Sequence, residues 1–305
     1  METKVTKEKL GLKPKEILWG SISLIIFIAI FLFVFKMYLS EGEKRKAEYT
    51  DAPATEDYLE VDIKVVGVDP IKGDLNTRIT MWPNGKYMNA KEFLTENVNF
   101  YINGATGKQE YNFQKGKIMN PIEVTFGLYG QVNDYPLDIH EALLVAVAEI
   151  PVKISANQNA DSMNEEMGEI IPLKVNFNAF LHGYKFDAEK DTTVGEPYTA
   201  MSVNVSRAGS TKFFSYFIMM AMWLLSGIVV FLVLSVIVRG RKIELGKFAF
   251  MSAMIFALPA LRNMQPLIPT IGTFSDYVSF FWAEALIALS LFTVVFTWLK
   301  RPPPK

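Results

Sequence analysis

The sequence has 305 residues, a formal net charge of −1 and no cysteine. The lack of cysteine excludes a disulfide framework, a thiolate nucleophile and a thiolate metal site. Apolar residues make up 50% of the chain and gather in four runs around one long polar block, a layout that predicts an integral membrane protein.

The first apolar run covers residues 17–35 and contains no charged side chain. It is long enough to cross a hydrocarbon core of about 30 Å. We expect an uncleaved signal anchor over residues 17–38, after a cytoplasmic tail of residues 1–16. A cleavable signal peptide is the alternative, but the run exceeds a usual signal-peptide core and residues 37–40 lack a small-x-small site. Residues 39–57 are polar and aperiodic, so we expect a linker.

The polar block, residues 58–207, shows the period-two pattern of β-strands, beginning with Leu59, Val61 and Ile63 on one face. Further strands are expected at residues 77–82, 98–102, 109–113, 122–128, 143–150, 173–180 and 199–205. Residues 143–150 could instead be helical, because alanines are frequent there. The pattern predicts an α+β membrane protein. Its exported all-β domain is an immunoglobulin-like β-sandwich, with a barrel as second choice, and four transmembrane helices carry it, one N-terminal and three C-terminal.

Three more apolar runs follow the polar block and predict spans at residues 213–238, 247–262 and 277–299. The middle span is short, but Lys247 and Arg262 frame it, and their long stems can extend towards the membrane surface. The predicted loops and tail that complete this part of the chain are residues 239–246, 263–276 and 300–305.

Charge predicts the orientation. Twelve Lys and Arg residues lie in the N-terminal tail, the 239–247 segment and the C-terminal tail. By the positive-inside rule both termini are cytoplasmic, and the β domain is periplasmic or extracellular at the cell (inner) membrane. Between residues 36 and 212 there are 18 Lys and Arg against 26 Asp and Glu, a net charge near −8. Such an acidic surface repels phosphate backbones, so no nucleic-acid partner is expected. The missing cysteines fit an exported bacterial domain better than a eukaryotic one.

Residues able to do chemistry are few. A zinc site needs three or four ligands, yet the only histidines are His140 and His182, which are 42 residues apart. No nucleotide-binding or hydrolase motif occurs at a strand–helix junction. The carboxylates Glu165 and Glu166 fall in a polar loop and are expected to be solvated. We therefore expect no enzyme activity, no metal and no cofactor.

One turn stands out, at Tyr135-Pro136-Leu137-Asp138. Proline fixes its own φ and pushes Tyr135 towards an extended conformation, while the Asp138 carboxylate can accept local backbone N–H bonds. We expect this unit to build a turn between strands.

The loop between the last two spans is the most specific region. Glu284 lies eight residues after Asp276, about 12 Å along a helix, where an ionised carboxylate is costly unless it is paired. Arg262 is the one nearby cation at the same membrane level. We expect an Arg262–Glu284 or Arg262–Asp276 clamp that locks the hairpin; the alternative is a cation or proton site. The candidate residues of this hairpin are Pro259, Arg262, Asn263, Pro266, Gly272, Asp276, Trp282 and Glu284.

The hairpin also carries a resemblance. The Tyr135-Pro136-Leu137-Asp138 turn and the single N-terminal span also contribute to this resemblance. The hairpin and the span after it read ALPALRNMQPLIPTIGTFSDYVSFFWAEALIALSLFTVVFTW. It resembles an uncharacterised family of multi-pass membrane proteins of bacteria and some fungi, domain of unknown function 4436. The resemblance implies a multi-pass architecture over nearly the whole chain and no assigned activity.

Three function classes are compatible with these features. A non-enzymatic scaffold that presents the β-sandwich for protein–protein assembly in the cell envelope is favoured, because one intramembrane carboxylate is few for a pore and the spans show no inverted repeat. Residues 206–212 couple the domain to the next span almost rigidly, which suits a platform but would also let movement of the sandwich bias the helices. Its expected partners are the lipid bilayer and an envelope protein or a second copy of the chain. A transporter or channel subunit using Glu284, Asp276 and Arg262 is the second hypothesis. An envelope enzyme comes last.

Overall fold

The computed structural model describes residues 14–44, 46–152, 168–242 and 244–301. The expected solvated carboxylates Glu165 and Glu166 lie outside these described residues. The chain divides into two compact units, Met1–Glu43 and Lys44–Lys305.

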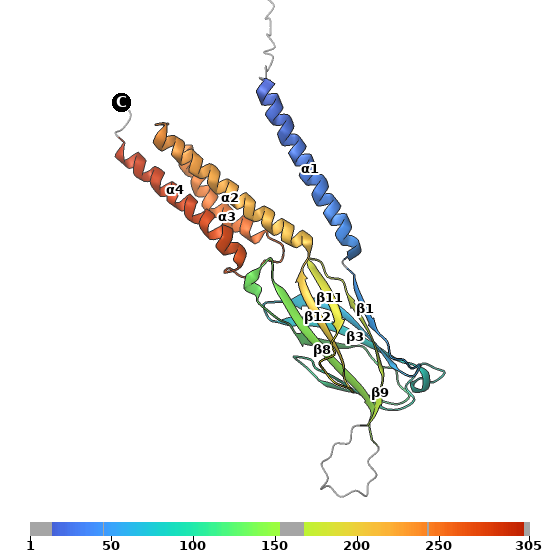
Figure 1. The fold of residues 1–305 in the computed structure, drawn as a ribbon. Helices are drawn as coiled ribbons and strands as arrows, with labels where there is room; N and C mark the ends of the chain where they lie inside the picture. Colours follow the sequence, from blue (N-terminus) through green and yellow to red (C-terminus); the bar gives the residue numbers. More distant parts are fainter. Residues whose placement is uncertain (1–13, 45, 153–167, 243, 302–305) are drawn as a thin grey trace, which may run out of the picture. The chain divides into compact units, whose positions relative to one another are not determined.

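The first unit contains helix α1, Pro14–Lys44 (Figure 1). Its apolar stretch is Ser21–Met37, and the side chains along that stretch are mostly exposed. The helix continues beyond the predicted end of the span at residue 38, because residues 39–44 contain no proline and are rich in good helix formers.

The second unit begins with two β-sheets (Figure 1). The first has the strand order β1-β10-β2-β3-β6, and the second has the order β11-β12-β8-β4-β5, with β7 and β9 also paired to β8. The strands are β1 (Ala47–Asp51), β2 (Leu59–Asp69), β3 (Asp74–Pro83), β4 (Val98–Ile102), β5 (Glu110–Phe113), β6 (Ile122–Gly127), β7 (Tyr129–Gly130), β8 (Ile139–Ile150), β9 (Glu169–Ile171), β10 (Leu173–Ala179), β11 (Tyr184–Lys190) and β12 (Thr199–Arg207). Short 3-10 turns lie at Gly85–Tyr87 and Val132–Asp134.

The two sheets enclose one apolar core, so the β-sandwich expectation is confirmed and the barrel alternative is wrong. Phe100, Phe126 and Phe177, from strands of both sheets, are fully buried in this core. Alternate residues of each strand point inwards, which is why the period-two pattern of the sequence located most strands.

Several expectations need correction. The strand expected at residues 143–150 is confirmed and only its helical alternative is wrong, because the alanines fill the inner face of β8 at alternate positions. The predicted linker 39–57 contains β1, whose residue Ala47 pairs with Ala179 of β10. Strand β11 was not predicted, although Tyr184, Phe186 and Ala188 alternate with charged residues there.

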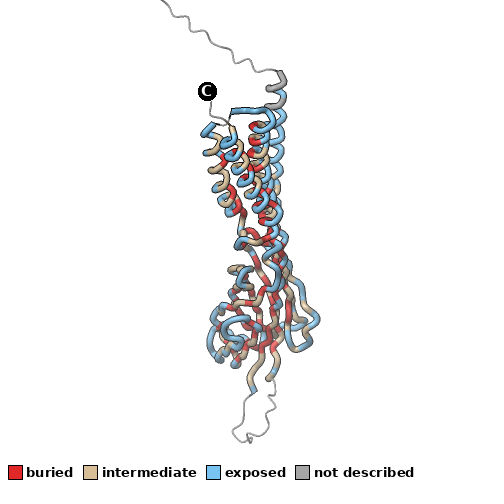
Figure 2. Tube along the Cα trace, turned by 90° about the vertical axis from the view of Figure 1, so that its left-hand side faces the viewer, coloured by how far each residue is buried: buried red, intermediate tan, exposed pale blue. Residues whose placement is uncertain are grey.

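Three helices of the second unit are long and apolar enough to cross a membrane, within the residues described. They are α2 (Gly209–Val238), α3 (Leu245–Asn263) and α4 (Phe281–Lys300), the last preceded by the π-helical turn η3 (Asp276–Phe280). Figure 2 shows buried residues both inside the sandwich and along these helices. Met222, Met251, Leu258 and Ile287 pack together where the three helices meet.

The sandwich passes into the helices almost without a linker. Strand β12 ends at Arg207 and helix α2 begins at Gly209, so only Ala208 lies between them. The short connector expected from the sequence is confirmed, and it brings the base of the sandwich against the first turns of α2.

Candidate functional site: the junction between sandwich and helices

Three segments that are distant in sequence meet at the base of the sandwich. They are the turn that begins at Tyr135, the passage from β12 into α2, and the loop between α3 and η3. All three segments were singled out from the sequence for separate reasons, and the structure joins them through hydrogen bonds. We call this region the junction.

The centre of the junction is a buried ion pair. The Arg207 Nε lies 3.0 Å and 2.9 Å from the two carboxylate oxygens of Asp138, and Arg207 Nη2 lies 2.8 Å from Oδ2. The two residues are only 3% and 1% exposed. A buried pair of this kind is stable only if the remaining N–H groups and lone pairs also find partners.

The remaining donors of Arg207 are used within the junction. Its Nη1 donates to the Tyr184 hydroxyl at 3.2 Å and to the Leu267 carbonyl oxygen at 3.2 Å. The guanidinium carbon also lies over the rings of Tyr135 and Tyr184, at 5.1 Å and 4.9 Å from their centroids. Arginine therefore holds the turn, strand β11 and the α3–η3 loop at once, through a planar fork that lysine lacks.

His140 is the third member of this cluster. Its Nε2 lies 3.0 Å from Asp138 Oδ2, and the side chain is buried. Its Nδ1 has no hydrogen-bond partner within the described part of the chain. Burial disfavours ionisation of Asp138, but the hydrogen bonds from His140 and Arg207 outweigh it and hold the pKa of Asp138 below its ordinary value. Asp138 is therefore an anion in the folded protein at neutral pH.

Tyr135 connects the turn to both helical segments. Its hydroxyl donates to the Pro266 carbonyl oxygen at 2.7 Å and lies 2.6 Å from the Ser215 hydroxyl on α2. Its backbone carbonyl accepts the Ser275 N–H at 3.3 Å. Burial raises the pKa of the Tyr135 phenol, which keeps it protonated and able to donate.

A glycine allows the loops to approach each other closely. Gly183 has φ +84°, and a Cβ there would lie 2.4 Å from Leu267 Cδ1. Its carbonyl oxygen accepts the Ala208 N–H at 2.9 Å and the Thr211 hydroxyl at 3.1 Å. The first turn of α2 is thus tied to the sandwich by side chain and backbone, and Gly183 is the residue that makes room for Leu267.

The α3–η3 hairpin has its own buried ion pair. Arg262 Nε lies 2.8 Å from Asp276 Oδ1 and Nη2 lies 2.9 Å from Oδ2, while Nη2 also donates to the Pro269 carbonyl oxygen at 3.0 Å. Asp276 Oδ2 accepts further bonds from the N–H groups of Gly272 and Thr273, at 2.8 Å and 3.0 Å. The hairpin clamp is therefore Arg262–Asp276.

The alternative clamp, Arg262–Glu284, is wrong. The guanidinium of Arg262 is directed to the loop, where backbone N–H groups already gather around Asp276. Glu284 lies further along α4, and its Oε2 is buried without a hydrogen-bond partner among the described residues.

The remaining predicted hairpin residues have ordinary places. Asn263 Oδ1 accepts a bond from Arg262 Nη1 at 3.3 Å. Pro259 lies inside α3, and the Trp282 side chain is 61% exposed. The turn prediction at residues 135–138 was right about a turn but wrong about Asp138, whose partners are the side chains of Arg207 and His140 and not local backbone N–H groups.

Arg207, Tyr184 and Ser215 were not identified from the sequence. Arg207 carried a usable signal, since it is a charged residue at an inward position of β12 directly before an apolar helix. Gln265 gave no signal, yet it is buried and both atoms of its amide lack a partner within the described residues. Burying an amide without hydrogen-bond partners costs free energy. The contacts of the neighbouring loop residues therefore have to offset this cost.

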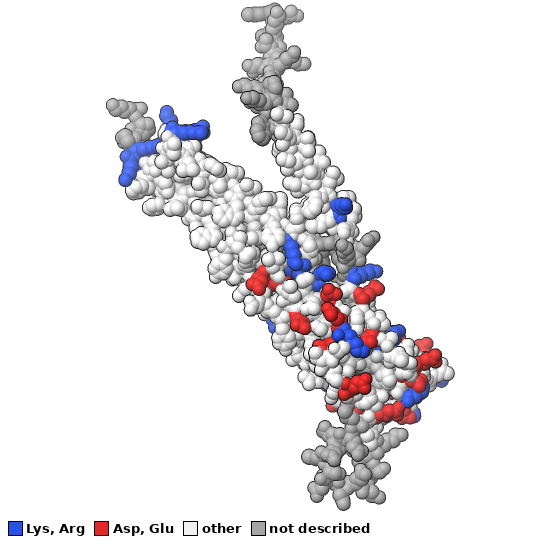
Figure 3. All heavy atoms as spheres, in the orientation of Figure 1, with Lys and Arg blue, Asp and Glu red and all other residues white. Residues whose placement is uncertain are grey.

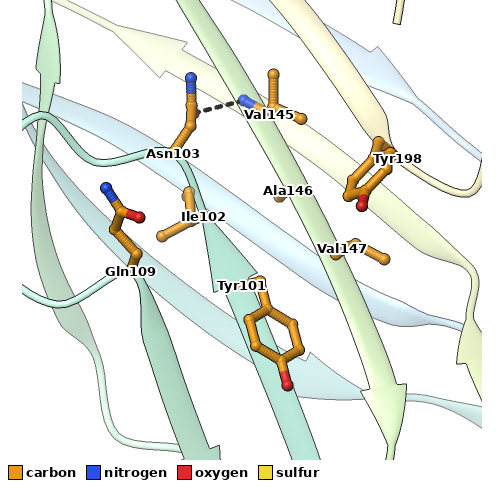
Figure 4. A pocket seen from close by; sticks show the side chains of 8 residues that line it. All are labelled: Tyr101, Ile102, Asn103, Gln109, Val145, Ala146, Val147 and Tyr198. Atoms are coloured by element: carbon orange, nitrogen blue, oxygen red, sulfur yellow. Dashed lines mark hydrogen bonds between the residues drawn. The ribbon is translucent and has the colours of Figure 1, made fainter. Parts of the chain in front are cut away.

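A second feature lies on the outer face of the β11-β12-β8-β4-β5 sheet (Figure 4). It is a depression of about 230 Å³ lined by residues that include Tyr101, Val147 and Tyr198. The side chain of Asn103, at the rim, already has protein partners for both of its polar atoms. Its Oδ1 accepts the Val145 N–H at 2.7 Å, and its Nδ2 donates to the Leu143 carbonyl oxygen at 2.8 Å. These side chains contain no pairing of a nucleophile with a base, and no cluster of three or more His, Asp or Glu able to hold a metal occurs among the described residues.

Two family models match the chain and meet at the junction. The Domain of unknown function (DUF8686) matches residues 207–301, which include the hairpin that carried the resemblance in the sequence. The Domain of unknown function (DUF4436) matches residues 49–206. A search of curated proteins found no match. The boundary falls between Ser206 and Arg207, so the central ion pair takes Asp138 from one matched region and Arg207 from the other. Because the model for residues 49–206 matches more than half of the chain, this protein belongs to the uncharacterised DUF4436 family.

Proposed function

We propose that this protein is a non-enzymatic integral membrane scaffold, which presents its β-sandwich outside the cytoplasm for assembly with another envelope protein. In this proposal α1, α2, α3 and η3–α4 form four spans of a bacterial inner membrane. Both termini are cytoplasmic, as the twelve flanking cations favour. Helix α1 has 31 residues, and its uncharged run, residues 17–35, corresponds to about 28 Å of helix, close to the thickness of a hydrocarbon core.

The observation that carries the proposal is the way the junction uses its charged groups. Arg207 is paired with Asp138 and Arg262 with Asp276, all four side chains being buried. Fully partnered buried charges hold one geometry well and are poorly suited to bind and release a solute. Together with the single-residue connector Ala208, they favour a domain mounted at a fixed angle on its helices.

A transporter or channel subunit is the second candidate, and one observation favours it. Glu284 Oε2 is buried in an apolar helix without a partner among the described residues, as expected for a group that binds a proton or cation. Against this candidate, Asp276 and Arg262 are engaged with each other and with the loop backbone, so Glu284 would have to act without them.

Site-specific photo-crosslinking in native membranes tests the proposal. A photoreactive residue placed at Ile71 or Ile118 of the sandwich, both exposed, should capture one defined protein; the same residue at Phe231 or Leu289, exposed on α2 and α4, serves as the matched helix control. Crosslinks only from helix positions would contradict presentation by the sandwich. Cation or proton flux in liposomes that Glu284→Gln abolishes without unfolding would favour the transporter.

A further inference from the structure

The end of the helices remote from the junction carries a dense group of cations. Three helix ends meet there, namely the end of α2, the start of α3 and the end of α4. We call the six cations of this end the basic face. They are Arg239, Arg241, Lys242, Lys247, Lys300 and Arg301.

Hydrogen bonds to the backbone bring these cations together. Arg301 Nη2 donates to the Val236 carbonyl oxygen at 2.9 Å, and Nη1 donates to the Arg241 carbonyl oxygen at 3.1 Å. Lys247 Nζ donates to the Lys242 carbonyl oxygen at 2.6 Å. The end of α4 is therefore tied to the end of α2, and the following loop is tied to the start of α3.

The basic face lacks balancing carboxylates. None of its six cations forms an ion pair with a described residue, and Glu244 is the one acidic side chain described in the same loop. At the junction, by contrast, both buried arginines are neutralised by aspartates. Figure 3 shows the resulting asymmetry, with Lys and Arg at the end of the helices where the C-terminus lies and a largely uncharged surface between that end and the sandwich.

The surroundings indicate which anion the face would meet. Arg239, Arg241, Lys242 and Lys300 are exposed, and they directly follow or precede apolar helices. Trp298 is 55% exposed and packs edge-on against Phe248, and an exposed tryptophan next to cations is typical of the plane of lipid headgroups. The carboxyl ends of α2 and α4 carry partial negative charge, which offsets part of the repulsion between the cations. This partial charge does not neutralise the cations, so they still attract an external anion.

We propose that the basic face is a binding site for the phosphate groups of anionic phospholipids, and that it enriches these lipids around the three helices. The inference rests on the membrane insertion in the proposed function. Headgroup phosphates of neighbouring lipids form a two-dimensional array of anions at the depth of these cations, and each exposed Lys or Arg gains attraction from a negatively charged leaflet.

The test is lipid selectivity of the full chain in bilayer vesicles. Spin-labelled phosphatidylglycerol and phosphatidylcholine at the protein boundary report the relative association of anionic and zwitterionic lipid. We expect a preference for phosphatidylglycerol that falls by about fivefold for each cation removed, and so by about 25-fold in Arg241→Gln combined with Lys242→Gln. The backbone carbonyls of both residues keep their bonds in this variant.

Lys108→Gln combined with Lys117→Gln is the control, because both lysines are exposed on the sandwich and the net charge changes equally. An equal loss in this control, or no preference in the unsubstituted protein, would overturn the inference. Inorganic phosphate is the second probe: stabilisation by phosphate in phosphatidylcholine vesicles, without enrichment of phosphatidylglycerol, would reassign the face to a free anion. Either failure leaves sandwich crosslinking unchanged, so it is distinguishable from failure of the scaffold.

Discussion

Arg207 and Asp138 are 69 residues apart in the sequence, yet their side chains are in contact at 2.8 Å and both are buried. Arg207 is the last residue of β12, two positions before α2 begins. The pair therefore fixes the direction in which the chain leaves the sandwich. The neighbouring contacts of Tyr135, Gly183 and Leu267 extend this control to the α3–η3 loop.

Removing either member of this pair should strongly destabilise the protein. Arg207→Ala or Asp138→Ala leaves a buried charge without its partner, which costs about 3–5 kcal/mol in comparable cases. Arg207→Lys should also be destabilising, because lysine cannot reproduce the fork of hydrogen bonds. The free energy of unfolding in detergent checks this. The matched control is the exposed Arg78–Glu123 pair, where Arg78→Ala should change stability by less than about 1 kcal/mol.

Stability should fall in acid through Asp138. The pKa of its carboxyl is lower in the folded protein than the ordinary 3.8, so the unfolded chain binds a proton first as the pH falls. The contribution is complete above the unfolded pKa, and it is lost in the acid range in which the pH falls through the lower folded pKa. The melting temperature of Asp138→Asn should therefore depend less on pH in this range. If the melting temperature of Asp138→Asn fell in acid as steeply as that of the unsubstituted protein, other carboxylates would account for the loss of stability.

The hairpin clamp should show energetic coupling between Arg262 and Asp276 and none between Arg262 and Glu284. Double-mutant cycles with alanine at each position measure this. Residues in direct contact commonly couple by more than about 0.5 kcal/mol, whereas independent sites add within that amount. Coupling of Arg262 to Glu284 as large as its coupling to Asp276 would show that the guanidinium is shared, contrary to the geometry.

Tyr135→Phe isolates the hydrogen bonds of one hydroxyl. The substitution leaves the ring over Arg207 but removes the donor to Pro266 and the neighbour of Ser215, so we expect a loss of about 1–3 kcal/mol. Tyr129→Phe is the control, since that side chain is 75% exposed and the change there should be near zero. Equal effects at both positions would mean that the Tyr135 hydroxyl adds nothing to the junction.

Strand β1 should be needed for a stable sandwich. A fragment of residues 46–207 keeps the pairing of Ala47 with Ala179, whereas a fragment of residues 56–207 exposes the edge of β10. Both should give β-type circular dichroism, and the longer fragment should melt at the higher temperature. Identical melting of the two would show that β1 is dispensable.

The sequence located elements that carry their own pattern. Strands β2, β4 and β10 alternate apolar and polar residues because one face of each lies in the core, and α2 and α4 contain long apolar runs. Strand β1 carries only a short and weak pattern, with Ala47 and Tyr49 half-buried against the core, and it pairs with β10, which lies more than a hundred residues later and offers an edge. Pairing at that distance leaves no local trace.

The same distinction holds for the junction. The Arg262–Asp276 clamp was within reach because both residues flank one short loop, although the choice between Asp276 and Glu284 depended on backbone N–H groups of Gly272 and Thr273. The Arg207–Asp138 pair could not be predicted in this way, because a local turn already explained the presence of Asp138. His140 was noted in the sequence, and it lies two residues after Asp138, so the two side chains share one side of the extended chain; this local signal did not enter the prediction.

A sandwich held in one orientation on its helices is the central claim, and a distance distribution tests it most directly. The chain has no cysteine, so single cysteines at exposed Asn112 and Leu289 would accept spin labels at those two sites alone. Pulsed dipolar spectroscopy in lipid vesicles should give one narrow distance, which becomes broad in Arg207→Ala. A broad distribution in the protein without Arg207→Ala would contradict the account, because the junction would then fail to fix the domain.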